Sequence, residues 1–431
     1  MDNSRKVDSI LTYYGKGVTP KYVAESSIIV LNQKCVRNNK IDYSFAQYID
    51  DQKKYNEDKF LKVGDILINS TGQGTAGRVA FVEKLPANKK VITDSHILVI
   101  RTNCHYESKC LNYSLFSIEK QLQTFMDGST GQGEFDKQRL FNIIVSYSRE
   151  HTVQKKIVNI LGDIDNKIDL NKQLNDNLER MAKTLYDYWF VQFDFPDGNG
   201  KPYKSSGRKM VFNEVLKREI PVDWEVTVFN DWVQKTKTGD WGKEEVDGNY
   251  TERVFCIRGA DINGLNGRGE VKAPERFILK NNLSKKLEPN DFIVEISGGS
   301  PTQSTARIAL LTMESFKRFD TDIICSNFCK ALTLKDQMFA FNFQQEWQRL
   351  YDAGVFFGFE GKTSGIKNFL FESFMDSYVI VKPSKDLVSE FYNFSEKIEK
   401  KRQKNLQQNQ QLSNLRDWLL PMLMNGQVKV E

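Results

Sequence analysis

The stretch of this sequence that most resembles a catalytic motif is Gly361-Lys362-Thr363. Gly-Lys-Thr ends the phosphate-binding loop of many nucleotide-hydrolysing enzymes. In that loop another glycine stands five residues before the glycine of Gly-Lys-Thr. Phe356 occupies that position here, so we interpret the stretch as a polar turn.

Other patterns that would support catalysis are missing from the sequence. It contains no Gly-x-Ser-x-Gly, no His-Glu-x-x-His and no Pro-Pro pair, and so it lacks the Asn/Asp-Pro-Pro-aromatic motif of adenine methyltransferases. Glu57-Asp58-Lys59 resembles part of a metal-dependent nuclease site, but a match this short arises by chance. We therefore expect a chain that has no catalytic residues of its own.

We do not expect a metal site or a bound cofactor either. The three histidines are far apart, and none of the six cysteines forms a Cys-x-x-Cys pair, so the ligands of a zinc site are not clustered. Free thiols suit a reducing cytosol. The sequence has neither a secretory leader nor a continuous apolar run long enough to cross a membrane, and we expect a cytoplasmic location.

The charge balance permits nucleic-acid binding without requiring it. The chain has 61 Lys and Arg against 56 Asp and Glu, a net charge of +5. An excess of this size is also ordinary for a solvated protein surface. At 431 residues the chain has room for two or three domains.

One long helical pattern occurs twice. Apolar residues from Ile157 to Tyr188 are spaced alternately four and three apart, which is the seam of a helix that pairs with another helix. Adding 234 to each number gives a second seam from Phe391 to Met422, with Lys and Asn at the same two positions. The predicted seam residues are Ile157, Ile160, Ile164, Lys167, Asn171, Leu174, Leu178, Met181 and Leu185, then Phe391, Phe394, Ile398, Lys401, Asn405, Gln408, Leu412, Leu415 and Leu419.

We expect these two helices to form an antiparallel coiled coil, which brings Lys167 and Asn171 near Lys401 and Asn405. A polar patch in such a seam costs stability but fixes the register. The alternative is that each helix docks separately on the block before it. A 32-residue helix is about 48 Å long, and one turn of B-DNA is ~34–36 Å, so the pair suits a reader of two separated half-sites.

Each long helix follows a larger block, and the blocks repeat weakly in the same order. We expect an α+β fold of two mixed α/β blocks related by a pseudo-twofold axis. The predicted organisation is a first block at 1–148, a helix at 149–193, a Gly/Pro-rich linker at 194–219, a second block at 220–384, a helix at 385–426 and a tail at 427–431. The segments that match between the blocks are Gly64–Ser70 with Asn290–Ser297, Arg78–Phe81 with Arg307–Leu310, and Thr93–His96 with Ile324–Asn327.

The first block also has a predicted secondary structure of its own. The predicted strands are Ser27–Leu31, Asp65–Ser70, Arg78–Val82, Ile97–Arg101 and Leu140–Val145, with a helix around Leu111–Phe125.

The chain resembles the specificity (S) subunits of type I restriction-modification systems over nearly its whole length. The duplicated plan is one part of the resemblance. Its most specific segments are Met181–Phe190, Phe193–Gly198, Ile220–Trp224 and Leu415–Gly426, and Lys16–Pro20 and Gly64–Ile68 are similar to the family's target recognition domains.

The resemblance implies two target recognition domains, each reading one half of a bipartite site in double-stranded DNA, and two spacer helices between them. In this family the spacer helices bind two modification (M) subunits, which hold S-adenosylmethionine and methylate adenine at N6. Restriction (R) subunits join for cleavage that uses ATP and Mg, and the S subunit itself is not catalytic. The alternative is a coiled-coil scaffold that holds two protein-binding domains and reads no DNA.

With DNA as the expected ligand, polar residues of the turns and Gly-rich loops become candidate contacts. Lys, Arg, Ser and Thr suit phosphates, and Arg, Lys, Asn and Gln suit base edges. Arg78 and Arg307 have a structural alternative, which is pairing with an Asp inside the block. The candidates are Lys16, Lys34, Arg37, Asn38, Ser70, Thr71, Gln73, Thr75, Arg78, Ser129, Thr130 and Gln132 in the first block, and Lys237, Arg258, Ser297, Ser300, Thr302, Gln303, Arg307, Lys362, Thr363 and Ser364 in the second, with Trp241 as a weaker one.

Overall fold

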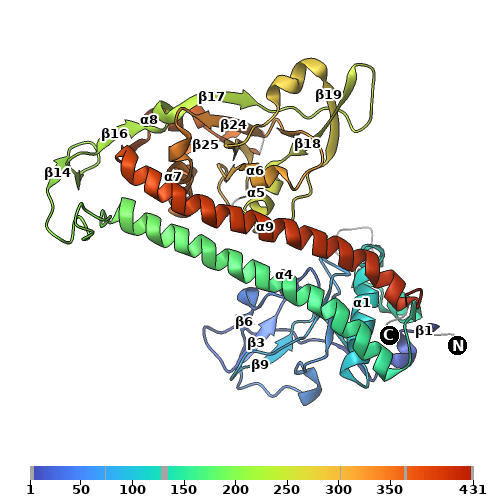
Figure 1. Ribbon diagram of the computed structural model, residues 1–431. Coiled ribbons are helices and arrows are strands. Elements are labelled where there is room, and N and C mark those ends of the chain that lie inside the picture. The colour runs from blue at the N-terminus through green and yellow to red at the C-terminus, as the bar shows by residue number, and fades with distance from the viewer. Residues whose placement is uncertain (1–3, 73, 128–133, 301, 364–365, 429–431) are drawn as a thin grey trace. The chain divides into compact units, whose positions relative to one another are not determined.

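The computed structural model describes residues 4–72, 74–127, 134–300, 302–363 and 366–428 (Figure 1). It divides into two compact units, and the division falls within both long helices. Unit 1 is Met1–Lys167 with Gln411–Glu431, and unit 2 is Ile168–Gln410. Each unit therefore holds one of the two blocks and a part of each helix.

Unit 1 is built on a four-stranded sheet and a three-stranded sheet. Buried apolar runs such as Ile66-Leu67-Ile68 form the central strands, because both of their faces are covered. The first sheet has the order β2 (Tyr13–Lys16), β10 (Ile97–Arg101), β7 (Ile66–Asn69), β8 (Val79–Phe81), and the second has the order β6 (Gln47–Tyr48), β3 (Ile28–Leu31), β9 (Lys90–Thr93). Smaller elements are the pairs β1 (Ser4–Lys6) with β13 (Ile144–Ser146), β4 (Val36–Arg37) with β5 (Lys40–Ile41) and β11 (Met126–Asp127) with β12 (Glu134–Phe135), and the helices α1 (His105–Ser117), α2 (Glu119–Leu122) and α3 (Lys137–Asn142).

Unit 2 repeats this plan with longer strands. Its sheets have the orders β17 (Val233–Thr238), β24 (Cys329–Leu334), β20 (Asp291–Glu295), β22 (Ile308–Leu310), and β19 (Glu275–Leu279), β18 (Tyr250–Ile257), β23 (Ile323–Cys325). It also has β14 (Met210–Asn213) with β15 (Arg218–Pro221), β16 (Glu225–Val228) with β27 (Val379–Lys382), and β21 (Ser297–Gly298), β26 (Ile366–Phe369), β25 (Glu360–Thr363). Its shorter helices are α5 (Gly259–Leu265), α6 (Met313–Phe316), α7 (Ala340–Asp352) and α8 (Phe371–Ser377).

The shared strand order supports the predicted repeat and defines which residues correspond. In unit 1, β7 pairs with β10 so that Asn69 faces Ile97, and in unit 2, β20 pairs with β24 so that Glu295 faces Cys329. In both units the three-stranded sheet has one antiparallel pair and one parallel pair. Asn69 and Glu295 are therefore equivalent positions.

The prediction of a strand at Leu140–Val145 is wrong in its first half. The segment begins in α3, and β13 starts only at Ile144. The helix forms because the Asp136 carboxylate caps its N-terminus by accepting hydrogen bonds from the backbone N–H groups of Gln138 and Arg139. The helical pattern predicted at Leu111–Phe125 lies in α1 and α2, and α1 begins earlier, at His105.

The segment predicted as a linker is ordered by its own side chains. The Asp197 carboxylate accepts hydrogen bonds from two backbone N–H groups of the turn and from Arg208. The Phe195 ring stacks on Trp224, with centroids 5.2 Å apart. The second half of the predicted linker forms β14 and the start of β15, so the segment after the first long helix is a folded part of unit 2.

The two long helices are α4 (His151–Tyr186), continued by a π-helical turn at Asp187–Val191, and α9 (Lys385–Met424), shown in green and red in Figure 1. In unit 2 they run antiparallel, since Asn171 contacts Asn409 whereas Tyr186 contacts Phe391. In unit 1, Asp165 of α4 binds Arg416 of α9 at 2.9 Å.

The predicted seam is right at one of its two heptad positions and wrong at the other. Ile157, Ile164 and Asn171 are buried as predicted, but the second buried row of α4 is Leu161, Ile168, Asn175 and Ala182. These residues are also seven apart, so the predicted period is correct and the second row was placed one residue too early. The seam residues found exposed are Lys167, Leu174, Met181, Lys401, Gln408 and Leu415.

Two further findings concern the described residues only. None of their helices is long and apolar enough to cross a membrane. No group of three His, Cys, Asp or Glu side chains among them is arranged to hold a metal ion.

Candidate nucleic-acid interface

The Gly-rich loop between β7 and β8 in unit 1 is fixed by its own polar side chains. Thr71 Oγ1 and His96 Nδ1 lie 2.8 Å apart, and the Thr75 hydroxyl donates to the carbonyls of Thr71 and Gly72. The backbone at Gly77 is left-handed, with φ of 80°, and an added Cβ would lie 2.6 Å from the backbone of Leu122. The part of the loop at Gly77 is thus held close to α2.

Arg78 and Arg307 occupy equivalent positions but have different partners. Arg307 forms two hydrogen bonds, of 2.8 and 2.6 Å, to the buried Glu295 carboxylate. In unit 1 the equivalent of Glu295 is Asn69, and Arg78 donates instead to the Gly74 carbonyl at 3.0 Å. The structural alternative therefore holds for Arg307, with a Glu in place of the expected Asp, and not for Arg78.

The remaining described candidates of unit 1 lie on two surfaces. Lys16 lines a hollow of about 440 Å³ with Ser70, Glu134 and Lys137, and it forms an ion pair with Glu134. Burial, and the charge of Lys137 next, lower the pKa of Lys16. Lys34, Arg37 and Asn38 are exposed at the turn around β4, where the Asn38 backbone has φ of 50°.

Unit 2 has a hollow of about 1210 Å³ that is lined by the segments after β20 and β23, by Phe357 and Glu360, and by Ile366 and Lys367 of β26. Its rim carries four large apolar side chains that solvent reaches. The exposed fractions are 39% for Trp241, 55% for Phe328, 46% for Phe357 and 48% for Ile366. Exposed aromatic side chains gathered around a hollow mark a binding surface.

The charged groups of this hollow are mostly neutralised by one another. Arg258 binds Asp261, Arg307 binds Glu295, and Lys367 binds Glu360 at 2.9 Å. Gly259 allows a close approach, since a Cβ there would lie 2.6 Å from the Glu295 carboxylate. The wall of the hollow is therefore rigid, and it presents apolar surface rather than free charge.

The other candidates of unit 2 fall into three groups. Lys237 is internal, since its ammonium binds the buried Asp291 at 3.0 Å, and the Ser297 hydroxyl donates to Asn368. Ser300, Thr302 and Gln303 lie in the loop after β21, next to the hollow. Lys362 and Thr363 belong to β25.

Five candidates from the two blocks lie outside the described residues. They are Gln73, Ser129, Thr130, Gln132 and Ser364.

Among the lining residues of the hollow that the candidate list missed are Asn327, Phe328 and Phe357. The predicted match of Thr93–His96 with Ile324–Asn327 pointed to Asn327, but it is wrong by one residue, since the strand register pairs His96 with Phe328. The two phenylalanines carried no signal, since exposed aromatic residues cannot be told from core residues in a chain with 29 Phe.

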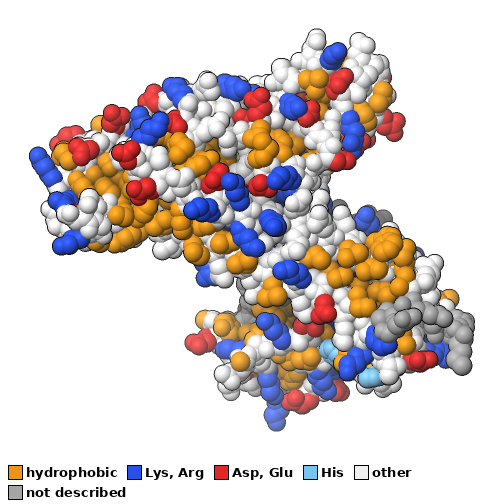
Figure 2. Space-filling model, in the orientation of Figure 1, with side chains coloured by type: hydrophobic (Ala, Val, Ile, Leu, Met, Phe, Trp, Pro, Cys, Tyr) orange, Lys and Arg blue, Asp and Glu red, His pale blue; other side chains and the backbone are white. Residues whose placement is uncertain are grey.

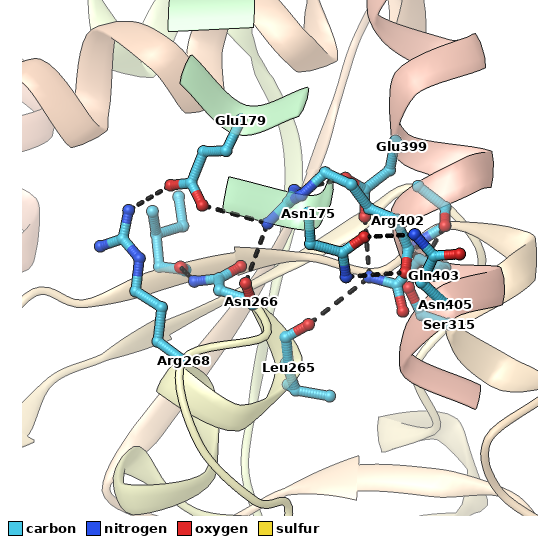
Figure 3. Close-up of polar contacts among 12 residues, drawn as sticks. Asn175, Glu179, Leu265, Asn266, Arg268, Ser315, Glu399, Arg402, Gln403 and Asn405 are labelled. Atoms are coloured by element: carbon cyan, nitrogen blue, oxygen red, sulfur yellow. Dashed lines mark hydrogen bonds and ion pairs between the residues drawn. The ribbon is translucent and has the colours of Figure 1, made fainter. Parts of the chain in front are cut away.

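A buried ionic network fastens α5 to both long helices within unit 2 (Figure 3). Arg402 of α9 donates to Glu399 at 2.7 Å, to Glu179 of α4 at 3.4 Å and to the Asn266 carbonyl at 2.9 Å. Burial lowers the pKa of Arg402, but the two carboxylates outweigh it and hold the pKa above its usual value. Arg318 donates to the carbonyls of Gly264 and Leu265 at the end of α5, and burial lowers its pKa to about 10.

Unit 1 has a smaller anchor at the corresponding place. Asp165, the repeat equivalent of Glu399, accepts hydrogen bonds of 2.9 Å from Tyr113 of α1 and from Arg416 of α9. Burial, and the Asp165 charge next, raise the pKa of Tyr113 well above its usual range. The Arg416 guanidinium also lies over the Phe116 ring, 5.3 Å from its centroid.

The long helices keep apolar side chains on their outer faces. Met181 is 53% exposed and Leu415, its repeat equivalent, is 44% exposed. We define the α4 stripe as Leu174, Leu178, Met181, Leu185 and Tyr188, and the α9 stripe as Leu412, Leu415, Trp418, Leu419 and Met422. Figure 2 shows hydrophobic side chains gathered over the C-terminal end of α4 and, in the other unit, over that of α9.

Comparison with known proteins agrees with this architecture. Residues 10–180 match the family described as "Type I restriction modification DNA specificity domain". Over 178 residues the chain is 31% identical to the type I restriction enzyme HindI specificity subunit of Haemophilus influenzae. The aligned region covers 40% of this chain and 37% of that protein. Over 286 residues it is 24% identical to the MjaIX specificity subunit of Methanocaldococcus jannaschii, covering 64% and 59%.

The match thus spans less than two thirds of either relative's length. Among solved structures, the crystal structure of a type I restriction-modification system S subunit from M. genitalium aligns with a TM-score of 0.53 and 14% identity. The alignment covers 98% of this chain and 95% of that one, and it shows a shared fold.

Proposed function

Because this chain belongs to the family of type I restriction-modification DNA specificity proteins, we propose that it is a non-catalytic specificity subunit that reads a bipartite site in double-stranded DNA. In this proposal the block of unit 1 binds one half-site and the block of unit 2 binds the other. The paired long helices set the length of the gap that is not read.

One observation carries the proposal: the two blocks share a strand order but differ in the side chains of equivalent loops. Among the described residues Arg78 has no carboxylate partner, whereas Arg307 is bound to Glu295, and His96 stands where unit 2 has Phe328. A duplicated scaffold with different loops suits the reading of two different base sequences, because loop side chains on a rigid framework determine specificity.

The catalytic groups that such a complex needs would come from partner proteins. We propose that two copies of an M subunit, each holding S-adenosylmethionine, dock on the α4 and α9 stripes. Four of the five residues in each stripe are repeat equivalents, so two copies of one partner can each meet a similar surface. R subunits, with ATP and Mg, would join this complex for cleavage.

A binding selection tests the proposal. The chain, co-expressed with its M subunits, is incubated with a library of random duplex DNA, and the retained DNA is sequenced. Enrichment of two short motifs at a fixed separation supports a specificity subunit. Retention without any enriched motif would favour a scaffold that holds two protein-binding domains.

A further inference from the structure

The loop Ser326–Phe328, between β23 and β24, presents two side chains at the hollow of unit 2. Ser326 is fully buried, and its backbone N–H donates to the Ile257 carbonyl at 2.8 Å. The Phe328 carbonyl accepts hydrogen bonds from Ile296 and Ser297 at 2.9 and 3.2 Å. Gly239 packs so closely that a Cβ there would lie 2.0 Å from the Ser326 carbonyl oxygen. Asn327 and Phe328 therefore stand on a rigid support.

The Asn327 side chain differs from the other polar groups of the hollow, because it is exposed and forms no hydrogen bond with any described residue. The charged groups around it are paired internally, as shown above for Arg258, Arg307 and Lys367. A carboxamide held at a largely apolar surface keeps both its donor and its acceptor for a ligand.

The chemistry of this pair of side chains matches one base pair. An asparagine carboxamide can bind N6 and N7 of adenine together in the major groove, and an apolar ring suits the methyl group of thymine. Phe328, next to Asn327 and 55% exposed, offers that ring. We propose that Asn327, together with Phe328, reads an A·T base pair in the half-site bound by unit 2; this rests on the proposed function.

The equivalent loop of unit 1 is built for a different contact. Strand register places Ser95 at the position of Asn327 and His96 at the position of Phe328. The Nδ1 atom of His96 lies 2.8 Å from the Thr71 hydroxyl. Its backbone N–H donates to the Asp94 carboxylate at 2.9 Å. One ring nitrogen of His96 is thus engaged inside unit 1, and the Ser95 side chain is a hydroxyl. Neither residue offers the paired donor and acceptor of a carboxamide, so the A·T reading belongs to unit 2 alone.

The test is the library selection with three variants in complex with the M subunits. Asn327→Ala removes the carboxamide, and Asn327→Asp keeps its shape but loses the donor. The matched control is Asn281→Ala, an exposed asparagine of unit 2 that does not line the hollow. Thermal unfolding of each variant confirms that it folds as the parent does.

We expect both Asn327 variants to lose preference for A·T at one position of one half-site, by roughly 5- to 150-fold, and to leave the other half-site unchanged. Asn281→Ala keeps the full motif. An unchanged motif in both Asn327 variants would overturn the assignment of Asn327 alone. Equal weakening on all sequences would overturn it too, since that is the signature of a phosphate contact. Absence of a two-part motif in the parent would overturn the proposed function itself.

Discussion

The side-chain amide of Asn171 donates a hydrogen bond of 2.8 Å to the side-chain oxygen of Asn409. The repeat-equivalent bond runs from Asn405 to Asn175, also at 2.8 Å. The same symmetry relates two bonds to the backbone, from Asn175 to the Arg402 carbonyl and from Asn409 to the Ile168 carbonyl. These four buried asparagines form a quartet with pseudo-twofold symmetry between α4 and α9. It fixes the register of the pair in unit 2.

The quartet predicts a specific loss of stability. Asn171→Ala removes the donor to Asn409 and leaves a buried carbonyl oxygen short of a partner, which costs about 1–3 kcal/mol. Lys167→Ala, one turn earlier on the exposed face, changes stability by less than about 0.5 kcal/mol. Denaturation in urea of the two variants and the parent measures both values. Equal stability of the two variants would show that the quartet contributes nothing.

The quartet also shows what the sequence could and could not predict. Asn175 and Asn409 are separated by 234 residues, as Asn171 and Asn405 are, so the duplication contained all four. The heptad interpretation placed the seam at the apolar Leu174 instead of the polar Asn175, because it took apolar residues as the buried ones and so placed the second row of the seam one residue too early. The expected partner of Asn171 was therefore Asn405, about one helical turn from the observed Asn409.

For the blocks, the local pattern predicted the strands but not the pairing of side chains. Ile97–Arg101 is a strand with the predicted bounds, because its apolar run is bounded by turn residues. The partner of Arg307 could not be predicted, since Glu295 meets it only through the register of β20 on β22. Which loop residues face the hollow likewise depends on contacts between distant segments.

A second prediction concerns the buried ionic network around Arg402 in unit 2. Arg402→Met leaves the carboxylates of Glu399 and Glu179 without their buried partner, and we expect it to cost about 3–5 kcal/mol. Arg268 also pairs with Glu179, but its side chain is 53% exposed, so Arg268→Met should cost less than about 1 kcal/mol. Thermal and urea unfolding of the two variants measure the difference. Similar costs would mean that Arg402 is not the centre of the network.

The two equivalent arginines should respond in opposite ways. Arg78→Ala should leave stability unchanged and reduce the salt dependence of DNA binding by about 0.9 in the log–log slope, as expected for one lost phosphate contact. Arg307→Ala leaves Glu295 buried without a partner and should destabilise unit 2 by about 3–5 kcal/mol. Binding isotherms at several salt concentrations, with unfolding curves, separate these outcomes. A large stability loss in Arg78→Ala would identify it as structural.

The stripes predict the number of M subunits bound. Met181→Asp places a charge in the α4 stripe, and Leu415→Asp does so in the α9 stripe; both side chains are exposed, so the fold should tolerate the change. We expect each single variant to retain one M subunit and the double variant none, as measured by the mass of the purified complex. The matched control is Asn177→Asp, an exposed residue of α4 outside the stripe. Full occupancy in the double variant would place the docking surface elsewhere.

The central claim is that one chain reads two different DNA half-sites. Mapping methylated adenines in a genome in which this chain and its M subunits are expressed tests it most directly. The account predicts methylation at one bipartite motif with two unlike halves and a constant gap. Methylation at a single continuous motif, or at two identical halves, would contradict it.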